Sequence, residues 1–184
     1  MTTLSNKPIL ECTGIERRFG GIVAVTGVDL VIQRGEIFGL VGPNGSGKTT
    51  LTNAITGFYP PNEGTVRLAG KNITGTAPHK VAKLGVARTF QNLALFNGMS
   101  VLDNILLGRH IHMHPGVFRT AFYWWAARPE EVENRKIVEE VIEFLQLESI
   151  RYELVDGLPI GLKKRVELAR ALVAEPQMLI LDEP

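Results

Sequence analysis

A glycine-rich stretch, GPNGSGKTT at Gly42–Thr50, contains the residues with the clearest chemical purpose in this sequence. It fits the spacing G-x-x-x-x-G-K-[ST], and it follows an apolar run and opens a segment suited to a helix. Glycines let successive backbone N–H groups turn inward, and a helix N-terminus adds the positive end of its dipole. The stretch therefore predicts a phosphate-binding loop (P-loop) for a nucleotide.

Two side chains of the P-loop have predicted roles of their own. Lys48 is expected to reach the terminal phosphates, and the Thr49 hydroxyl can ligate Mg²⁺. The candidate nucleotide-binding residues are Gly42, Pro43, Asn44, Gly45, Ser46, Gly47, Lys48, Thr49 and Thr50. Many classes of enzyme use such a loop, so other motifs must decide the function.

Two adjacent carboxylates, Asp182 and Glu183, follow the apolar run MLIL. Side-by-side carboxylates in an apolar setting are costly unless a cation compensates them, so a solvated acidic turn fits this context poorly. Asp182 is expected to hold Mg²⁺ directly or through water. Glu183 is the expected catalytic residue, because it can orient and deprotonate the water that attacks a γ-phosphate.

Five segments read as strands that position these residues. Segments 9–19, 28–33 and 64–70 are rich in β-forming residues and end at turn signals, which predicts an antiparallel patch. Segments 36–42 and 178–182 are short apolar runs of the kind that is buried on both faces of a parallel sheet. We expect these two to be parallel core strands.

Two helices are predicted between those core strands. Apolar residues recur on one helical face over 132–147 and again over 161–174, where Pro176 forbids continuation. The order of strands and helices predicts an α/β fold.

The composition limits the function classes. The chain has 184 residues, 45% of them hydrophobic, and a formal net charge of +1, which gives no bulk argument for a nucleic-acid partner. The single cysteine excludes an internal disulfide. Neither a secretory signal nor an apolar run of membrane-spanning length is present, so a cytosolic protein is expected.

Four motifs in order resemble the ATP-binding subunits of ABC transporters: GPNGSGKTT, TFQNLALF, LPIGLKKRVELARAL and LILDEP. The TFQ segment and the insert after it look most like the branched-chain amino acid uptake ATPases. The resemblance implies a P-loop NTPase (ABC ATPase) core with an antiparallel β subdomain and a helical subdomain, in one domain over 1–184. Residues 7–90 and 176–184 would form the nucleotide-binding core, and 92–174 the Q-loop, insert and helical signature subdomain.

The resemblance assigns further roles by position. Phe19 matches the aromatic residue that stacks on adenine. Gln91 matches the glutamine that reaches Mg²⁺ or the attacking water while its loop contacts the permease, which makes it a second catalytic and metal-binding candidate. Leu158, Pro159, Ile160, Gly161 and Leu162 stand where most members read L-S-G-G-Q, the signature that contacts ATP across a dimer.

Pro159 departs from this signature. It has neither a hydroxyl nor an N–H, so two donors to the γ-phosphate are absent, while Gly161 and the helix start remain. The insert raises an open question too, because its aromatic residues at 118–125 could face a permease or the membrane interface, or could cap a helical core.

The implied function is ATP binding and hydrolysis in an ABC importer for branched-chain or other amino acids. The cofactors would be ATP and Mg²⁺. The partners would be a second copy or a related ATPase subunit and integral membrane permease subunits, with no nucleic acid, on the cytoplasmic face of the cell membrane. The alternatives are a soluble ABC-class ATPase that is not coupled to transport and a non-hydrolysing nucleotide-binding fragment.

The resemblance also implies a strand after LILDEP that lies between segments 36–41 and 178–182. By the resemblance, segment 178–182 is the Walker B strand, and we therefore expect a chain truncated after it and hydrolytically inactive alone. We expect the two segments to be roughly parallel but not hydrogen-bonded to each other.

Overall fold

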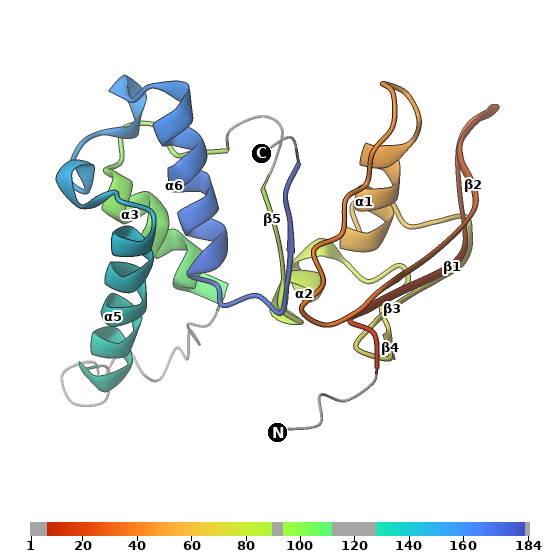
Figure 1. The fold of residues 1–184 in the computed structure, drawn as a ribbon, viewed down its shortest axis with the longest axis horizontal. Helices are drawn as coiled ribbons and strands as arrows, with labels where there is room; N and C mark the ends of the chain where they lie inside the picture. Colours follow the sequence, from red (N-terminus) through yellow and green to blue (C-terminus); the bar gives the residue numbers. More distant parts are fainter. Residues whose placement is uncertain (1–6, 90–93, 112–127, 183–184) are drawn as a thin grey trace. The chain divides into compact units, whose positions relative to one another are not determined.

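The computed structural model describes residues 7–89, 94–111 and 128–182. Its helices and strands are β1 (Leu10–Phe19), β2 (Ile22–Ile32), α1 (Lys48–Thr56), β3 (Glu63–Leu68), β4 (Lys71–Asn72), α2 (Pro78–Lys83), β5 (Val86–Arg88), α3 (Val101–Leu106), η1 (Leu107–Ile111), α5 (Arg128–Phe144), η3 (Glu148–Ile150), η4 (Val155–Gly157), α6 (Ile160–Leu172) and β6 (Met178–Ile180) (Figure 1). They form two compact units, residues 1–84 and 85–184.

The first unit is built on an antiparallel sheet in the order β2-β1-β3-β4. The two-residue turn Gly20–Gly21 joins β1 to β2, since Phe19 pairs with Ile22. β3 pairs with the other edge of β1. The predicted antiparallel patch is thus confirmed.

Helix α1 is bounded by two glycines in the left-handed region, Gly47 at φ 89 and Gly57 at φ 80. A glycine after the last turn is the commonest helix stop, because other residues resist this conformation. The buried face of the helix carries Leu51, Ala54 and Ile55, and the helix contacts β1, β2 and α2. The helix predicted after the P-loop is confirmed.

The strand predicted at 36–42 is wrong. These residues form no strand, and Ile37 and Val41 are 100% and 93% exposed. A strand needs a hydrogen-bonded neighbour for its backbone groups, and no strand in the described ranges pairs with this segment.

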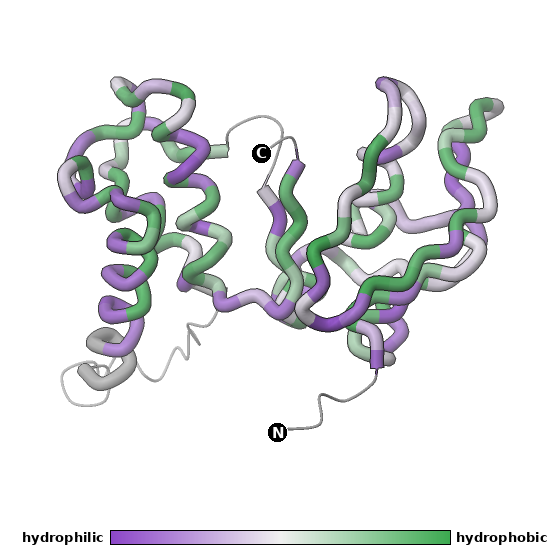
Figure 2. The backbone as a smooth tube through the Cα atoms, viewed as in Figure 1, coloured by the Kyte–Doolittle hydropathy of each residue, from purple (hydrophilic) through white to green (hydrophobic). Residues whose placement is uncertain are grey.

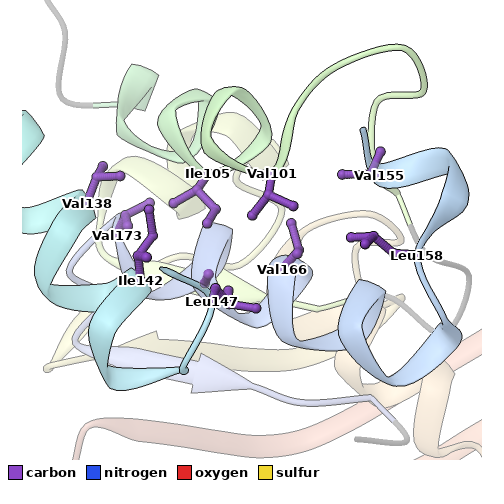
Figure 3. Close-up of a cluster of buried hydrophobic side chains, with 10 residues drawn as sticks. Val101, Ile105, Val138, Ile142, Leu147, Val155, Leu158, Val166 and Val173 are labelled. Atoms are coloured by element: carbon purple, nitrogen blue, oxygen red, sulfur yellow. The ribbon is translucent and has the colours of Figure 1, made fainter. Parts of the chain in front are cut away.

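The second unit has a helical core built from α3, α5 and α6. Its buried members point toward one another from these helices and from the connecting turns (Figure 3). They are Val101, Ile105, Val138, Ile142, Leu147, Val155, Leu158, Val166, Ala169 and Val173. Figure 2 shows the separation of hydrophilic and hydrophobic residues to opposite sides of α5, as the helical periodicity predicted. Both predicted helices are confirmed.

A buried arginine ties the ends of these helices together. Arg109 in η1 donates from Nε to Asn134 Oδ1 at 2.8 Å and from Nη1 to the Val173 carbonyl at 2.7 Å. Nη1 also lies 2.7 Å from Glu175 Oε2. A charge that is 7% exposed needs such partners.

Strands β5 and β6 pair in parallel, with Val86 opposite Met178 and Arg88 opposite Ile180. The parallel strand predicted at 178–182 is therefore confirmed over Met178–Ile180. Its three residues are half-buried rather than buried on both faces, so that part of the prediction is wrong. The physical reason is the small sheet, which pairs β6 on one edge only within the described residues.

Candidate functional site

The P-loop leaves a set of backbone donors at the start of α1. The first helical bond runs from the Leu51 N–H to the Gly47 carbonyl at 2.8 Å. The N–H groups of Lys48, Thr49 and Thr50 precede it and have no acceptor within the helix. No side chain caps this end at Gly47. These donors and the helix dipole suit an anion.

Gly47 is required by close packing as well as by its φ angle. A Cβ at this position would lie 2.5 Å from the Ala24 carbonyl oxygen of β2 and 3.0 Å from the Val25 side chain. Because both neighbours belong to a strand, the backbone cannot move away cheaply. The sheet therefore fixes the point at which the loop turns into α1.

Lys48 is half-buried at the first position of α1, and its ammonium folds back over the loop. Nζ donates to the Gly42 carbonyl at 2.6 Å and to the Pro43 carbonyl at 2.8 Å. The loop is further closed by the Ser46 N–H, which donates to the Pro43 carbonyl at 3.2 Å. The positive charge is thus held at the mouth of the loop.

The remaining P-loop side chains lie at the surface or half-buried. Asn44, Ser46 and Thr49 are exposed, and Thr50 is half-buried. Within the described part of the chain, the Thr49 hydroxyl takes no hydrogen bond. It is a hard oxygen donor at the end of the loop, which fits Mg²⁺, an ion that takes few protein oxygens together with phosphate oxygens and water.

Phe19 lies at the end of β1 and is 40% exposed. Its ring meets Tyr59 edge-on, with centroids 5.5 Å apart. The Arg17 guanidinium covers it at 4.7 Å from the ring centroid and also donates to the Pro60 carbonyl at 2.8 Å. Sequence reasoning missed Tyr59 and Arg17, because only the return of the chain after α1 brings residues 59–60 to β1.

Asp182 follows β6, and its carboxylate has a cationic partner that sequence reasoning missed. Arg88 Nη2 lies 2.8 Å from Asp182 Oδ2, and the two side chains are 7% and 20% exposed. The Asp182 N–H donates to the Thr89 hydroxyl at 3.3 Å. The signal that identifies Arg88 as this partner is the parallel register of β5 and β6, which no single sequence motif contains.

Glu183 and Gln91 lie outside the described residues, as does the aromatic cluster of the insert.

The signature segment begins α6, as the sequence predicts. Leu158 is buried at 7% exposure, Pro159 is the N-cap, and Ile160 is 67% exposed. The Pro159 carbonyl accepts from the N–H groups of Leu162 and Lys163, both at 3.0 Å. Gly161 is exposed, with no atom within 4 Å of an added Cβ. The signature segment is thus exposed at residues 159–161, and the buried Leu158 packs into the helical core.

One arginine of α6 binds the segment that follows Gln91. Arg170 Nη1 donates to the Ala94 carbonyl. Burial lowers the pKa of the Arg170 guanidinium, and the Glu167 carboxylate acts in the opposite direction. Arg170 is therefore a structural contact to residue 94 in this state, whereas Arg165 is exposed.

Two other findings bear on chemistry. Burial raises the pKa of Cys12 to about 12, so this thiol stays protonated and unreactive near neutral pH. In the described ranges, no helix combines the length and apolar character that crossing a bilayer requires.

Comparison with known proteins gives one consistent family. A family profile described as "ABC transporter" matches residues 25–184. The chain is 39% identical to the high-affinity branched-chain amino acid transport ATP-binding protein BraF of Pseudomonas aeruginosa, over 97% of this chain and 70% of that protein. It is 36% identical to the corresponding protein LivG of Escherichia coli K12, with the same coverage.

Solved structures give the same result. A nucleotide-free ATP-binding cassette from an ABC transporter matches with a TM-score of 0.79 and 35% identity, over 96% of this chain and 69% of that one. The ADP conformation of an ATP-binding cassette matches with a TM-score of 0.77 at 35% identity, with the same coverage.

Proposed function

Because this chain belongs to the ABC transporter family, whose ATP-binding members are ATPases, we propose that it is the ATP-binding and hydrolysing subunit of an importer for branched-chain or other amino acids. The observation that carries the solute class is the name shared by relatives that are 36% and 39% identical over 97% of the chain. In this proposal residues 1–184 act as one ABC ATPase domain, with 7–90 and 176–184 as its nucleotide-binding core.

The P-loop binds the phosphates of ATP. The N–H groups at the start of α1 donate to phosphate oxygens, and Lys48 exchanges its two carbonyl acceptors for the β- and γ-phosphates. Phe19, which is 40% exposed, stacks on adenine. The exposed side chains of Asn44 and Ser46 border the same phosphates.

Thr49, Gln91 and Asp182 are the residues that would hold Mg²⁺. All three offer hard oxygen donors, the ligand type that this ion prefers. When bound, the ion neutralises charge on the phosphate oxygens. Glu183 orients the attacking water and takes its proton, and Gln91 helps to place that water.

The signature segment Leu158–Leu162 contacts ATP that is held by a second ATPase subunit. The exposure of Ile160 and Gly161 at the start of α6 supports this role, because the helix N-terminus is open to an anion there. Pro159 supplies no donor, so this contact is weaker than in a segment with serine at that position.

Pro159→Ser restores both an N–H and a hydroxyl, so it is expected to tighten the ATP-dependent dimer by at least about 1.5 to 3 kcal/mol, the value of one hydrogen bond to a charged group. It should also stabilise the chain without ATP by about 1 kcal/mol, because position 159 is an N-cap with no side-chain bond. Sedimentation with ATP gives the dimer affinity, and chemical unfolding without ATP gives the stability.

Pro159→Ala is the matched control, because it restores the N–H without the hydroxyl. Equal dimer affinities for the serine and alanine variants would show that a side chain at 159 does not contact ATP.

The partners proposed for this subunit are a second ATPase subunit, either an identical copy or a related one, and integral membrane permease subunits. The segment around Gln91 is the proposed permease contact. Arg170 donates to the carbonyl of Ala94, which follows that segment. The subunit would lie on the cytoplasmic face of the membrane through this contact.

The transport function is tested in proteoliposomes that hold the permease co-purified with this protein from membranes. ATP-dependent uptake of labelled leucine, isoleucine or valine is expected to exceed uptake of labelled lysine, and hydrolysis should rise with the permease present. Hydrolysis at one rate with and without the permease would favour a soluble ATPase instead.

A further inference from the structure

The pair formed by Arg88 and Asp182 is built by the register of the small parallel sheet. Arg88 is the last residue of β5 and lies opposite Ile180 of β6. Asp182 lies two residues beyond Ile180, just after the end of β6. The long Arg88 side chain reaches it diagonally, with Nη2 2.8 Å from Oδ2.

This ion pair is largely removed from water. The Arg88 side chain is 7% exposed and that of Asp182 is 20% exposed. A charge in such a place needs compensation, and loss of Arg88 takes from the Asp182 carboxylate the guanidinium that faces it. The pair is therefore part of the fold as well as of the site. In the proposed function, the Asp182 carboxylate of this pair also binds a second cation, Mg²⁺.

In the proposed site, the Arg88 guanidinium and the divalent ion cannot bind Asp182 independently of each other. A guanidinium fixed at 2.8 Å from one carboxylate oxygen repels a divalent ion that approaches the other, and this repulsion is little screened where water is scarce. The guanidinium also compensates the negative charge of the Asp182 carboxylate. A carboxylate without this partner would attract a metal ion more strongly.

We propose that Arg88 is a positioning residue that serves as the counter-charge of Asp182 while no metal is bound, and so keeps divalent cations from binding at Asp182 before ATP arrives. This inference rests on the proposed ATP and Mg²⁺ function. With ATP bound, phosphate oxygens add negative charge and ligands, and the divalent ion then outcompetes the guanidinium for Asp182. The pair makes metal binding conditional on nucleotide.

The test measures binding of Mn²⁺ alone by electron paramagnetic resonance, in the folded chain without nucleotide. Arg88→Met keeps the side-chain length and removes the charge, so Mn²⁺ affinity is expected to rise at least tenfold over that of the unaltered chain. The double variant Arg88→Met/Asp182→Asn should lose this gain. Arg88→Lys should bind Mn²⁺ nearly as weakly as the unaltered chain.

Arg151→Met is the matched control for net charge in the same unit. Arg151 lies 2.8 Å from Glu139 Oε2 in another ion pair, so its loss should leave Mn²⁺ affinity unchanged. Unchanged or weaker Mn²⁺ binding in Arg88→Met would overturn the proposal and leave Arg88 a purely structural residue.

Two further measurements, Mn²⁺ binding by the unaltered chain and ATP binding with Mn²⁺, test the inference and the proposed function separately. If Arg88→Met does not fold, the unaltered chain still answers: tight Mn²⁺ binding without nucleotide would overturn the proposal. The proposed function is separately tested by ATP. Failure of the unaltered chain to bind ATP with Mn²⁺ would contradict that function, whereas normal ATP binding with no effect of Arg88→Met would contradict this inference alone.

Discussion

Lys48→Ala is expected to lower ATP affinity by at least about two orders of magnitude, because charge-assisted hydrogen bonds to two phosphates are lost together. The structure adds a second cause. The ammonium also binds the Gly42 and Pro43 carbonyls, so its loss removes two bonds that shape the loop before ATP arrives. Titration of the purified chain with a fluorescent ATP analogue measures the effect.

Two variants isolate the cause of this loss. Lys71→Ala removes the same charge from β4, at an exposed site in the same unit, and should leave ATP affinity unchanged. Lys48→Arg keeps the charge but not the compact ammonium, so it should bind ATP more weakly than the unaltered chain and more tightly than Lys48→Ala. Unchanged affinity in Lys48→Ala would contradict the assignment of Gly42–Thr50 to phosphate binding.

Glu183→Gln is expected to keep ATP binding and to slow hydrolysis by about 10² to 10⁴-fold, the usual contribution of a general base. The amide can still hold a water molecule but cannot take its proton. Since ATP is the proposed contact between the two subunits, a variant that binds but does not hydrolyse it should accumulate as an ATP-bound dimer. Phosphate release in the reconstituted transporter gives the rate, and sedimentation with ATP and Mg²⁺ gives the dimer fraction.

Glu148→Gln, an exposed carboxylate in η3, is the control for loss of a negative charge and should hydrolyse normally. Hydrolysis at the parent rate in Glu183→Gln would assign the base to another residue. Slow hydrolysis without an accumulated dimer would show that Glu183 acts in hydrolysis but that hydrolysis does not control dissociation of the dimer.

The sequence by itself determined the features that depend on neighbouring residues. The P-loop conformation needs Gly45, Gly47 and Lys48 within a few positions, so its motif predicts its geometry. The helices over 128–144 and 160–172 were readable because 3.6-residue periodicity records which face is buried. The antiparallel strands were readable from β-forming residues between turn signals.

Only the tertiary structure decided the features that join distant parts of the chain. Arg88 and Asp182 are 94 positions apart, and Arg109 reaches the Val173 carbonyl over 64 positions. Nothing local to either arginine marks its partner, because a salt bridge or hydrogen bond between distant residues depends on strand register and helix packing. Tyr59 meets Phe19 for the same reason.

The apolar segment at 36–42 shows that strand-like composition alone does not produce a strand. Its residues have the β-branched and apolar character of a buried strand, yet Ile37 and Val41 are almost fully exposed. Composition records what a segment can become, but a strand exists only when a neighbour supplies hydrogen-bond partners for its backbone. That partner is a property of the fold and cannot be read from the segment itself.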